Sequence, residues 1–124
     1  MKAETLVKQQ AAASVPDVAV ADVAAYFRVL AEPSRLKLLQ ALYDGRRSVG
    51  ELTELLDCSM ANVSRHLSAL ARQGMVERVT EGTTAYYSIA DPTINALCDI
   101  VCKGLLARME AQNAQRKALK KRLT

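Results

Sequence analysis

The chain has 124 residues, half of them hydrophobic, and a formal net charge of +4, which suits one domain and is compatible with a polyanionic partner. Aromatic residues make up only 4% and tryptophan is absent, so the core must be aliphatic, and this composition favours packed helices. No apolar run reaches the roughly 18 residues that cross a bilayer, and the N-terminus lacks the apolar stretch of a signal peptide, so we expect no membrane partner and a cytoplasmic protein with reduced thiols.

The chain begins with a polar stretch and two expected helices. Residues 1–16 are Ala-rich and polar and are expected to form a flexible N-terminal arm. Asp17 is suited to cap a first helix that runs to Leu30. Pro33 breaks that helix and suits the first turn of a second one, which the Asp44-Gly45 pair ends.

The central segment predicts two short helices joined by a tight turn. Ser48 is an N-cap candidate with Glu51 three residues on, the pattern of a capping box. Ser59 is expected to cap the fourth helix, which Gly74 ends. The apolar residues of this fourth helix form one stripe that should face the core, namely Val63, Leu67 and Leu70.

The apolar period then changes from helical to alternating. Residues 76–80 and 85–89 predict two strands, with a hairpin turn over residues 81–84. Asp91-Pro92 is expected to cap and start a final long helix. The whole pattern predicts a mostly α fold with a small β-hairpin, a winged helix-turn-helix domain over residues 17–112, followed by a basic tail over residues 113–124.

The fourth helix is the expected DNA-reading element. A recognition helix needs small or hydrogen-bonding side chains at its exposed N-terminal end to enter the major groove, while hydroxyl groups near a helix start suit phosphate oxygens. The hairpin is expected to reach the flanking DNA backbone. The predicted DNA-binding residues are Ser59, Met60, Ala61, Asn62, Ser64, Arg65 and His66 on the helix, with Arg78 and Thr83 or Thr84 on the hairpin. His66 is equally compatible with packing in the core.

Five segments carry a resemblance to a known family, namely Val29–Leu39, Val49–Leu52, Ser59–Leu67, Gly74–Val76 and Glu81-Gly82 before Tyr86-Tyr87. Through these segments the chain resembles the ArsR/SmtB family of bacterial repressors over roughly residues 20–106. The resemblance implies a homodimer built from the first and last helices. It also implies binding to a palindromic double-stranded operator, and release when a metal, metalloid or oxidant binds.

The family's commonest sensor sites are not found at the matching positions. Arsenite sensors use cysteines in the third helix, a cadmium and lead subgroup uses cysteines in the fourth, and persulfide sensors use one in the second. In this chain other residues stand at those positions. Of the zinc and cobalt ligands on the last helix only Asp91 remains. The replaced positions are Ser48, Gly50, Thr53, Ala69, Gln73, Gln40, Thr93, Gly104 and Ala107.

Three cysteines remain as candidate inducer ligands. Cys98 and Cys102 are four residues apart, which places them on one helix face with Cβ atoms roughly 5–6 Å apart. A soft ion can bridge two such thiolates, whereas a disulfide needs Cβ atoms about 3.5–4.5 Å apart. A persulfide or polysulfide bridge also fits. Trivalent arsenic or antimony is expected first, and cadmium or lead next, with Cys58 as a candidate third ligand. All three cysteines are also compatible with structural roles.

The sequence therefore predicts a DNA-binding repressor that leaves its operator when a thiophilic inducer binds, with no cofactor needed for DNA binding. A persulfide-sensing repressor, a ligand-independent DNA-binding protein and a winged helix that contacts only proteins remain alternatives. No catalytic triad, phosphate-binding glycine loop or carboxylate pair is found, so an enzyme is not expected. The basic tail is compatible with DNA attraction or with a solvated helix end.

Overall fold

The computed structural model describes residues 16–123, so the expected arm lies outside the described residues except for Pro16. The chain divides into two compact units, one ending at Ile89 and one beginning at Ala90. The first unit contains helices α2 (Asp17–Leu30), α3 (Pro33–Ala41), α4 (Val49–Leu56) and α5 (Met60–Arg72), with strands β1 (Arg47–Ser48), β2 (Val76–Glu81) and β3 (Thr84–Ile89). The second contains α6 (Pro92–Leu123).

Helix α2 begins one residue earlier than expected, whereas α3 begins where the sequence predicts. Pro16, not Asp17, occupies the N-cap position of α2, and no side chain caps it. The Pro16 carbonyl accepts from the backbone N–H groups of residues 19 and 20 at 2.8 and 3.1 Å, so the helix starts one residue earlier. Asp17 then acts through its charge in the first turn. Pro33 begins α3, as predicted, and the Glu32 side chain accepts from the Ser34 N–H at 3.1 Å.

The expected caps of the helix-turn-helix segment are confirmed. Ser48 and Glu51 form a complete capping box at the start of α4. Ser59 Oγ accepts from the Asn62 N–H at 3.2 Å at the start of α5. Between the two helices Asp57 adopts a left-handed conformation with φ 48°, which makes the connection tight. Because each cap satisfies N–H groups that a helix start leaves unpaired, the sequence defines both starts locally.

The wing is larger than the expected hairpin because it has a third strand. The strand order is β1-β3-β2, with both pairs antiparallel. Glu81 pairs with Thr84 around a two-residue turn in which Gly82 has φ 62°, a conformation that glycine adopts without strain. The two-residue strand β1 pairs Arg47 with Tyr87. A strand this short has no alternating pattern of its own, so the sequence analysis missed it.

The core of the first unit is aliphatic, as the composition predicts. Its largest fully buried side chains come from α3, α4 and α5 and from the residues directly after α3 and before β2. They are Leu38, Leu42, Leu52, Val63, Leu67, Leu70 and Met75. The predicted stripe of α5 is therefore the side that faces the core. The opposite side of α5 faces solvent, and this division fixes which side chains the helix can present to a ligand.

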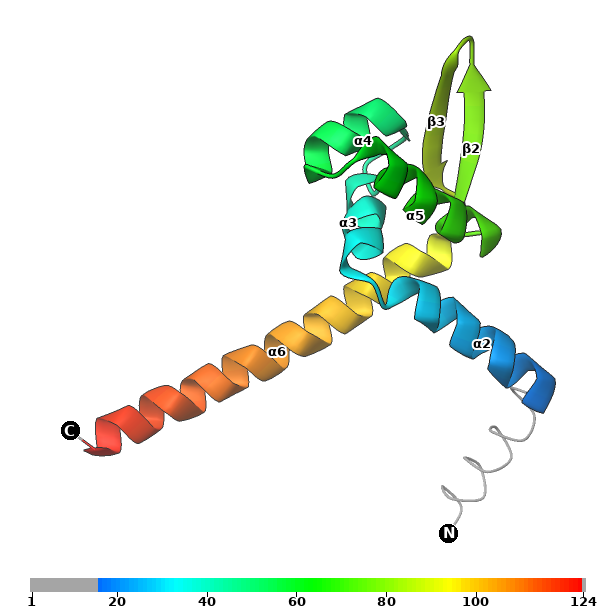
Figure 1. The fold of residues 1–124 in the computed structure, drawn as a ribbon. Helices are drawn as coiled ribbons and strands as arrows, with labels where there is room; N and C mark the ends of the chain where they lie inside the picture. Colours follow the sequence, from blue (N-terminus) through cyan, green and yellow to red (C-terminus); the bar gives the residue numbers. More distant parts are fainter. Residues whose placement is uncertain (1–15, 124) are drawn as a thin grey trace. The chain divides into compact units, whose positions relative to one another are not determined.

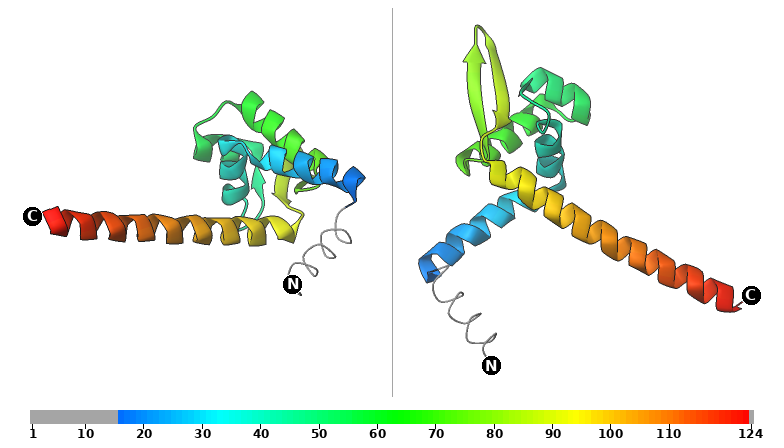
Figure 2. Two further views of the ribbon diagram at one scale, coloured as in Figure 1. Left: turned by 90° about the horizontal axis from the view of Figure 1, so that it is seen from below. Right: turned by 180° about the vertical axis from the view of Figure 1, so that it is seen from behind.

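The second unit is one long helix of 32 residues, uninterrupted in every view of Figures 1 and 2. Asp91 Oδ1 accepts from the Thr93 N–H at 2.9 Å, which confirms the expected cap. The helix continues to Leu123, so the described part of the basic tail is helical. Ile94 is buried, but most of its other large apolar side chains are exposed. None of the described helices is long and apolar enough to span a membrane.

Candidate nucleic-acid interface and cysteine site

The outer side of α5 carries the predicted base-reading side chains. Met60, Ala61, Asn62 and Arg65 are all exposed on the first two turns. Asn and Arg can each make paired hydrogen bonds to base edges in a major groove. Among the described residues, none of these four side chains forms an ion pair or a side-chain hydrogen bond, so a bound duplex would not have to compete with such a partner. The structure therefore presents these four residues together, as a recognition helix requires.

The two predicted phosphate-contacting serines lie in different environments. Ser59 is exposed and already uses its oxygen to cap α5, but a hydroxyl group that accepts a hydrogen bond keeps its own hydrogen to donate. Ser64 is half-buried one turn further along. Ser59 is therefore the better placed of the two to donate to a phosphate beside the helix start.

His66 is buried, unlike the other predicted DNA-binding residues. Arg35 Nε donates to His66 Nδ1 at 3.2 Å, which joins α5 to α3. Burial lowers the pKa of His66, and the Arg35 and Arg65 charges lower it further while Glu32 opposes them. A neutral imidazole is the form that accepts at Nδ1. The buried His66 thus joins α5 to α3 and does not lie on the exposed face of α5.

The wing presents Arg78 and Thr83, both exposed, and Thr84, which is half-buried. Arg46, which no sequence pattern indicated as functional, contacts this wing near the turn end of β2. Its guanidinium donates to both carboxylate oxygens of Glu81 at 2.7 and 3.0 Å and lies 4.3 Å from the centre of the Tyr86 ring. The pair raises the pKa of Arg46 and lowers that of Glu81. Only the strand register brings these residues together.

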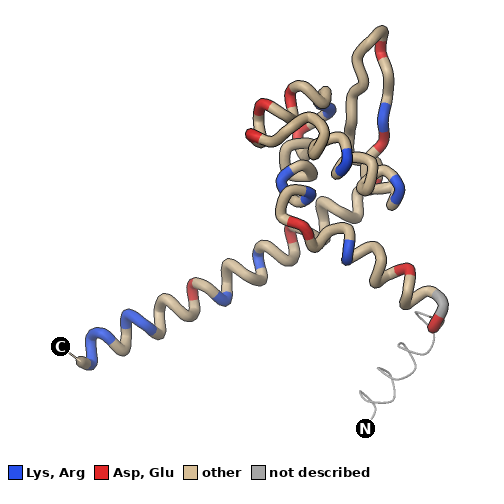
Figure 3. The backbone as a smooth tube through the Cα atoms, viewed as in Figure 1, with Lys and Arg blue, Asp and Glu red and all other residues tan. Residues whose placement is uncertain are grey.

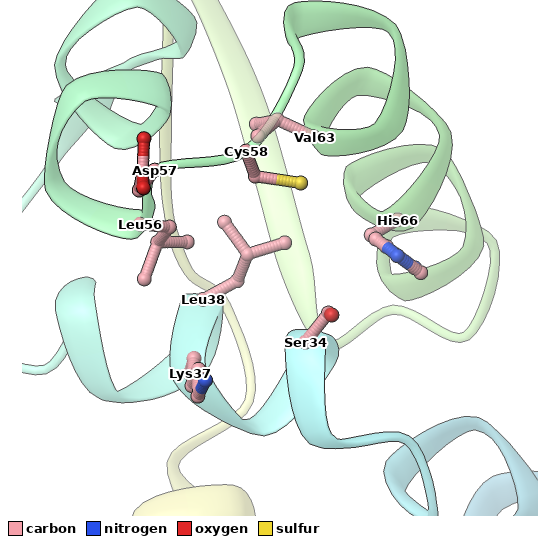
Figure 4. A pocket seen from close by; sticks show the side chains of 8 residues that line it. All are labelled: Ser34, Lys37, Leu38, Leu56, Asp57, Cys58, Val63 and His66. Atoms are coloured by element: carbon pink, nitrogen blue, oxygen red, sulfur yellow. The ribbon is translucent and has the colours of Figure 1, made fainter.

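Cys58 lies in the connection between α4 and α5 and lines a cavity of about 170 Å³ (Figure 4). Figure 4 shows its sulfur pointing across the cavity towards the α5 side that carries His66. The residues lining the cavity with Cys58 are Ser34, Lys37, Leu38, Leu56, Asp57, Val63 and His66. Leu38, Val63 and His66 of this set are buried, so the Cys58 side chain lies beside the core between α3 and α5.

Cys98 and Cys102 both lie on α6, four residues apart in continuous helix. Cys98 is half-buried and Cys102 is exposed, and both are free thiols. Burial raises the pKa of the Cys98 thiol, and the neighbouring Cys102 raises it further. Next to them Lys103 pairs with Asp99 at 2.9 Å. Among the described residues of either unit, no group of three or more His, Cys, Asp or Glu side chains could hold a metal ion, so α6 offers a pair of sulfur ligands.

Comparison with known proteins identifies the class of this chain. A family model described as a helix-turn-helix domain matches residues 30–79. The chain is 39% identical over 115 residues to a probable mercury resistance operon repressor of Streptomyces lividans, covering 92% of this chain and 87% of that protein. The matched helix-turn-helix region contains the whole of α3, α4 and α5.

Solved structures show the same fold. Rv0081 of Mycobacterium tuberculosis is 36% identical with a TM-score of 0.64, covering 73% of this chain and 91% of that one. The winged helix-turn-helix domain of Mb0332 from Mycobacterium bovis, described as homodimeric and as a possible ArsR-family regulator, is 32% identical with a TM-score of 0.66, covering 77% and 94%. The chain belongs to the ArsR/SmtB-like family of helix-turn-helix transcriptional regulators.

Proposed function

We propose that this protein is a dimeric repressor that binds operator DNA through α5 and the wing and leaves it when a soft cation binds Cys98 and Cys102. The observation that carries the proposal is the combination of two surfaces in one chain. One is a capped helix that exposes Asn62 and Arg65. The other is a pair of thiols on a single face of α6.

The DNA-binding part is supported by the division of α5 into a buried and an exposed side. Because the buried stripe holds the helix against the core, the exposed side is rigidly presented. Asn62 and Arg65 would read bases, while Ser59, Arg78 and Thr83 would contact phosphates. Arg46 would keep the wing in position through Glu81 and Tyr86.

Dimerisation is supported by apolar side chains that α6 leaves exposed. Val101, Leu105 and Met109 recur at helical spacing and are 49%, 43% and 61% exposed, so they form one stripe. Helix α2 likewise exposes Val23 and Phe27. A second copy of the chain would cover such faces, and the similar Mb0332 domain is described as homodimeric.

The inducer site is supported by the donor set of α6. Two thiolates on adjacent turns suit a soft cation that accepts two sulfur ligands. Mercuric ion fits this pair and is our first candidate, because the similar Streptomyces lividans protein is described as a probable mercury resistance repressor. Trivalent arsenic or antimony would accept a third sulfur, from Cys58 or from a partner chain. Cadmium or lead would also draw on further ligands.

A redox role for the pair is less favoured. Oxidation and persulfide chemistry proceed through the thiolate, and the raised pKa of Cys98 keeps this thiol protonated near neutral pH. An intrahelical disulfide would also require distortion of α6, because its Cβ atoms would have to approach each other. A cation displaces the proton as it binds, so it can use the thiol that oxidants reach slowly.

The proposed mechanism is a linkage between two sites. Cys98 and Cys102 border the Val101–Leu105 stripe, so a cation that bridges them changes the packing of the proposed dimer interface. If the DNA-binding arrangement of the two recognition helices is disfavoured by that change, operator affinity falls by the coupling free energy, typically about 1–3 kcal/mol. That range corresponds to roughly 5- to 150-fold weaker DNA binding.

The test is DNA binding by the full chain to the segment upstream of its own gene, measured by fluorescence anisotropy. Mercuric ion, arsenite, antimonite, cadmium, lead and zinc are added separately, with a phosphine reductant because thiol reductants bind these ions. A persulfide donor is added after the reductant has been removed, because phosphines consume persulfides. We expect mercuric ion to release the DNA at about one equivalent per chain. Cys98→Ser and Cys102→Ser should abolish the release, whereas Cys58→Ser, the matched control, should retain it.

Other results would contradict separate parts of the proposal. Release by persulfide alone would make the protein a sulfur sensor. Arsenite release that is lost in Cys58→Ser would indicate a three-sulfur site. Tight DNA binding that no addition changes would reject the inducer site, and DNA binding that is weak and insensitive to salt would reject the repressor function itself.

The raised pKa of Cys98 also predicts a pH dependence of cation binding. Because the thiol is protonated below its pKa, the bound ion must displace that proton, and affinity should rise with pH. We expect about a tenfold gain per pH unit for each thiol proton that the ion displaces, measured by competition against a chelator of known protonation between pH 6 and 8. Equal affinities across that range would show that Cys98 is not a ligand.

A further inference from the structure

The positive charge of the chain is concentrated at one end. Residues 116–122, called here the basic segment, contain five Lys and Arg, and no acidic residue follows Glu110. Removing these five from the total of 17 leaves twelve Lys and Arg against thirteen Asp and Glu. The rest of the chain therefore has a net charge of −1, and the +4 of the whole protein depends on this segment. Figure 3 shows the clustering of Lys and Arg at the end of α6.

The basic segment is ordered as helix and every residue in it is exposed. At about 100° per residue, four of its cations fall within an arc of about 140°. These four are Arg116, Lys117, Lys120 and Lys121, whereas Arg122 lies on another side. They span about 7.5 Å along the axis. The segment is thus a one-sided cationic surface rather than a scattered solvated tail.

We propose that the basic segment binds the phosphate backbone of double-stranded DNA, in addition to the groove contacts proposed for α5. The inference rests on the proposed DNA-binding function. The rest of the chain has a net charge of −1, so these cations carry the net positive charge of the protein and with it the attraction that supplies most non-specific DNA affinity. Phosphates of one strand recur about every 3.4 Å of helix axis, and the 7.5 Å surface therefore faces about two to three of them.

Two other occupants fit the segment less well. A helix that lies on a membrane needs a broad apolar face, but the only large apolar residues after Met109 are Leu119 and Leu123. A second copy of the same segment would place like charges side by side, which is destabilising. DNA requires only the cations that the segment presents.

The test compares the full chain with a variant in which Arg116, Lys117, Lys120 and Lys121 are replaced by Gln, which keeps helix propensity. DNA affinity is measured for the upstream segment and for a scrambled duplex between 50 and 300 mM salt. We expect the slope of log K against log salt to become shallower by about 2 to 3 per chain. The ratio of affinities for the two duplexes should change little, because phosphate contacts carry no sequence information.

A matched control replaces Lys117, Lys120 and Lys121 by Arg, which preserves charge and should preserve the slope. Circular dichroism verifies that both variants retain their helix content. An unchanged slope in the Gln variant would overturn the inference. Charge-dependent binding to phosphatidylserine vesicles in the same experiment would then indicate a membrane contact in place of DNA. Failure of the proposed function is distinct, because the unmodified chain would then fail to prefer the upstream segment over the scrambled duplex.

Discussion

The two units of the chain use the same kinds of residue in opposite ways. In the first unit Leu52, Leu67 and Leu70 are completely buried, whereas on α6 Leu105 and Leu106 are 43% and 55% exposed. A buried leucine stabilises its own unit by leaving water. An exposed stripe on a helix stabilises nothing until another surface covers it. These leucines of the first unit therefore stabilise its fold, whereas those of α6 are available for the proposed association.

The net charge is also distributed unevenly along the chain. In the first unit Arg46 pairs with Glu81, and Arg47 lies 3.7 Å from Glu51. The end of α6 has cations with no acidic residue after Glu110 in the sequence. Surface ion pairs contribute little to stability. The excess positive charge at the end of α6 therefore matters for binding, because it attracts a polyanion.

The largest expected effect comes from breaking the core of the first unit. Leu67→Ala should lower the free energy of unfolding by about 2–5 kcal/mol, because it leaves a cavity beneath α5. Leu123→Ala, at a position 79% exposed, should change it by less than about 0.5 kcal/mol. Chemical denaturation followed by circular dichroism measures both. Equal effects of the two substitutions would refute the contrast between the units.

The next effect concerns association rather than folding. Leu105→Asp places a charge in the exposed stripe of α6 and should weaken the proposed dimer at least tenfold, since burying an unpaired charge is costly. Ile100→Asp is the control, because Ile100 lies on a different side of the helix and is 69% exposed. Sedimentation equilibrium gives the dissociation constants. A dimer that tolerates Leu105→Asp would show that this stripe is not the interface.

A smaller effect separates two roles of Ser59. Ser59→Ala removes the cap of α5 and should cost about 1 kcal/mol of stability. Ser59→Asp keeps a capping oxygen and should retain that stability, yet its negative charge should weaken DNA binding by repelling phosphate. Thermal unfolding and DNA titration of the two variants measure these separately. Undiminished DNA binding by Ser59→Asp would place this residue away from the backbone.

The smallest expected effect is a pH dependence from His66, the only histidine. Its pKa is lowered in the folded state by burial, so folding favours the neutral form. The stability that this lowered pKa contributes is present above the unfolded pKa of about 6.5, and it is lost as the pH falls through the lower folded pKa. His66→Gln should therefore lose less stability than the unmodified chain between pH 7 and 5. Equal losses of unfolding free energy in the two proteins between pH 7 and pH 5 would contradict this.

Much of the fold follows from local signals in the sequence. The Ser48–Glu51 box, the Ser59 and Asp91 caps, Pro33 at a helix start and Gly82 in the turn all act within a few residues. Such interactions depend on side-chain type and spacing, which the sequence displays directly. For the same reason the spacing of Cys98 and Cys102 placed both thiols on one face of a helix.

Other features were decided only by tertiary packing. The pairing of Arg46 with Glu81 joins residues 35 positions apart, and the Arg35–His66 hydrogen bond joins residues 31 apart. The strand β1 exists because Arg47 lies beside Tyr87. The burial of His66, with its hydrogen bond to Arg35, also depends on neighbours from α3. The sequence determined the elements and their faces because those depend on near neighbours, whereas the fold alone decided which distant side chains meet, because each such contact requires several elements to pack together.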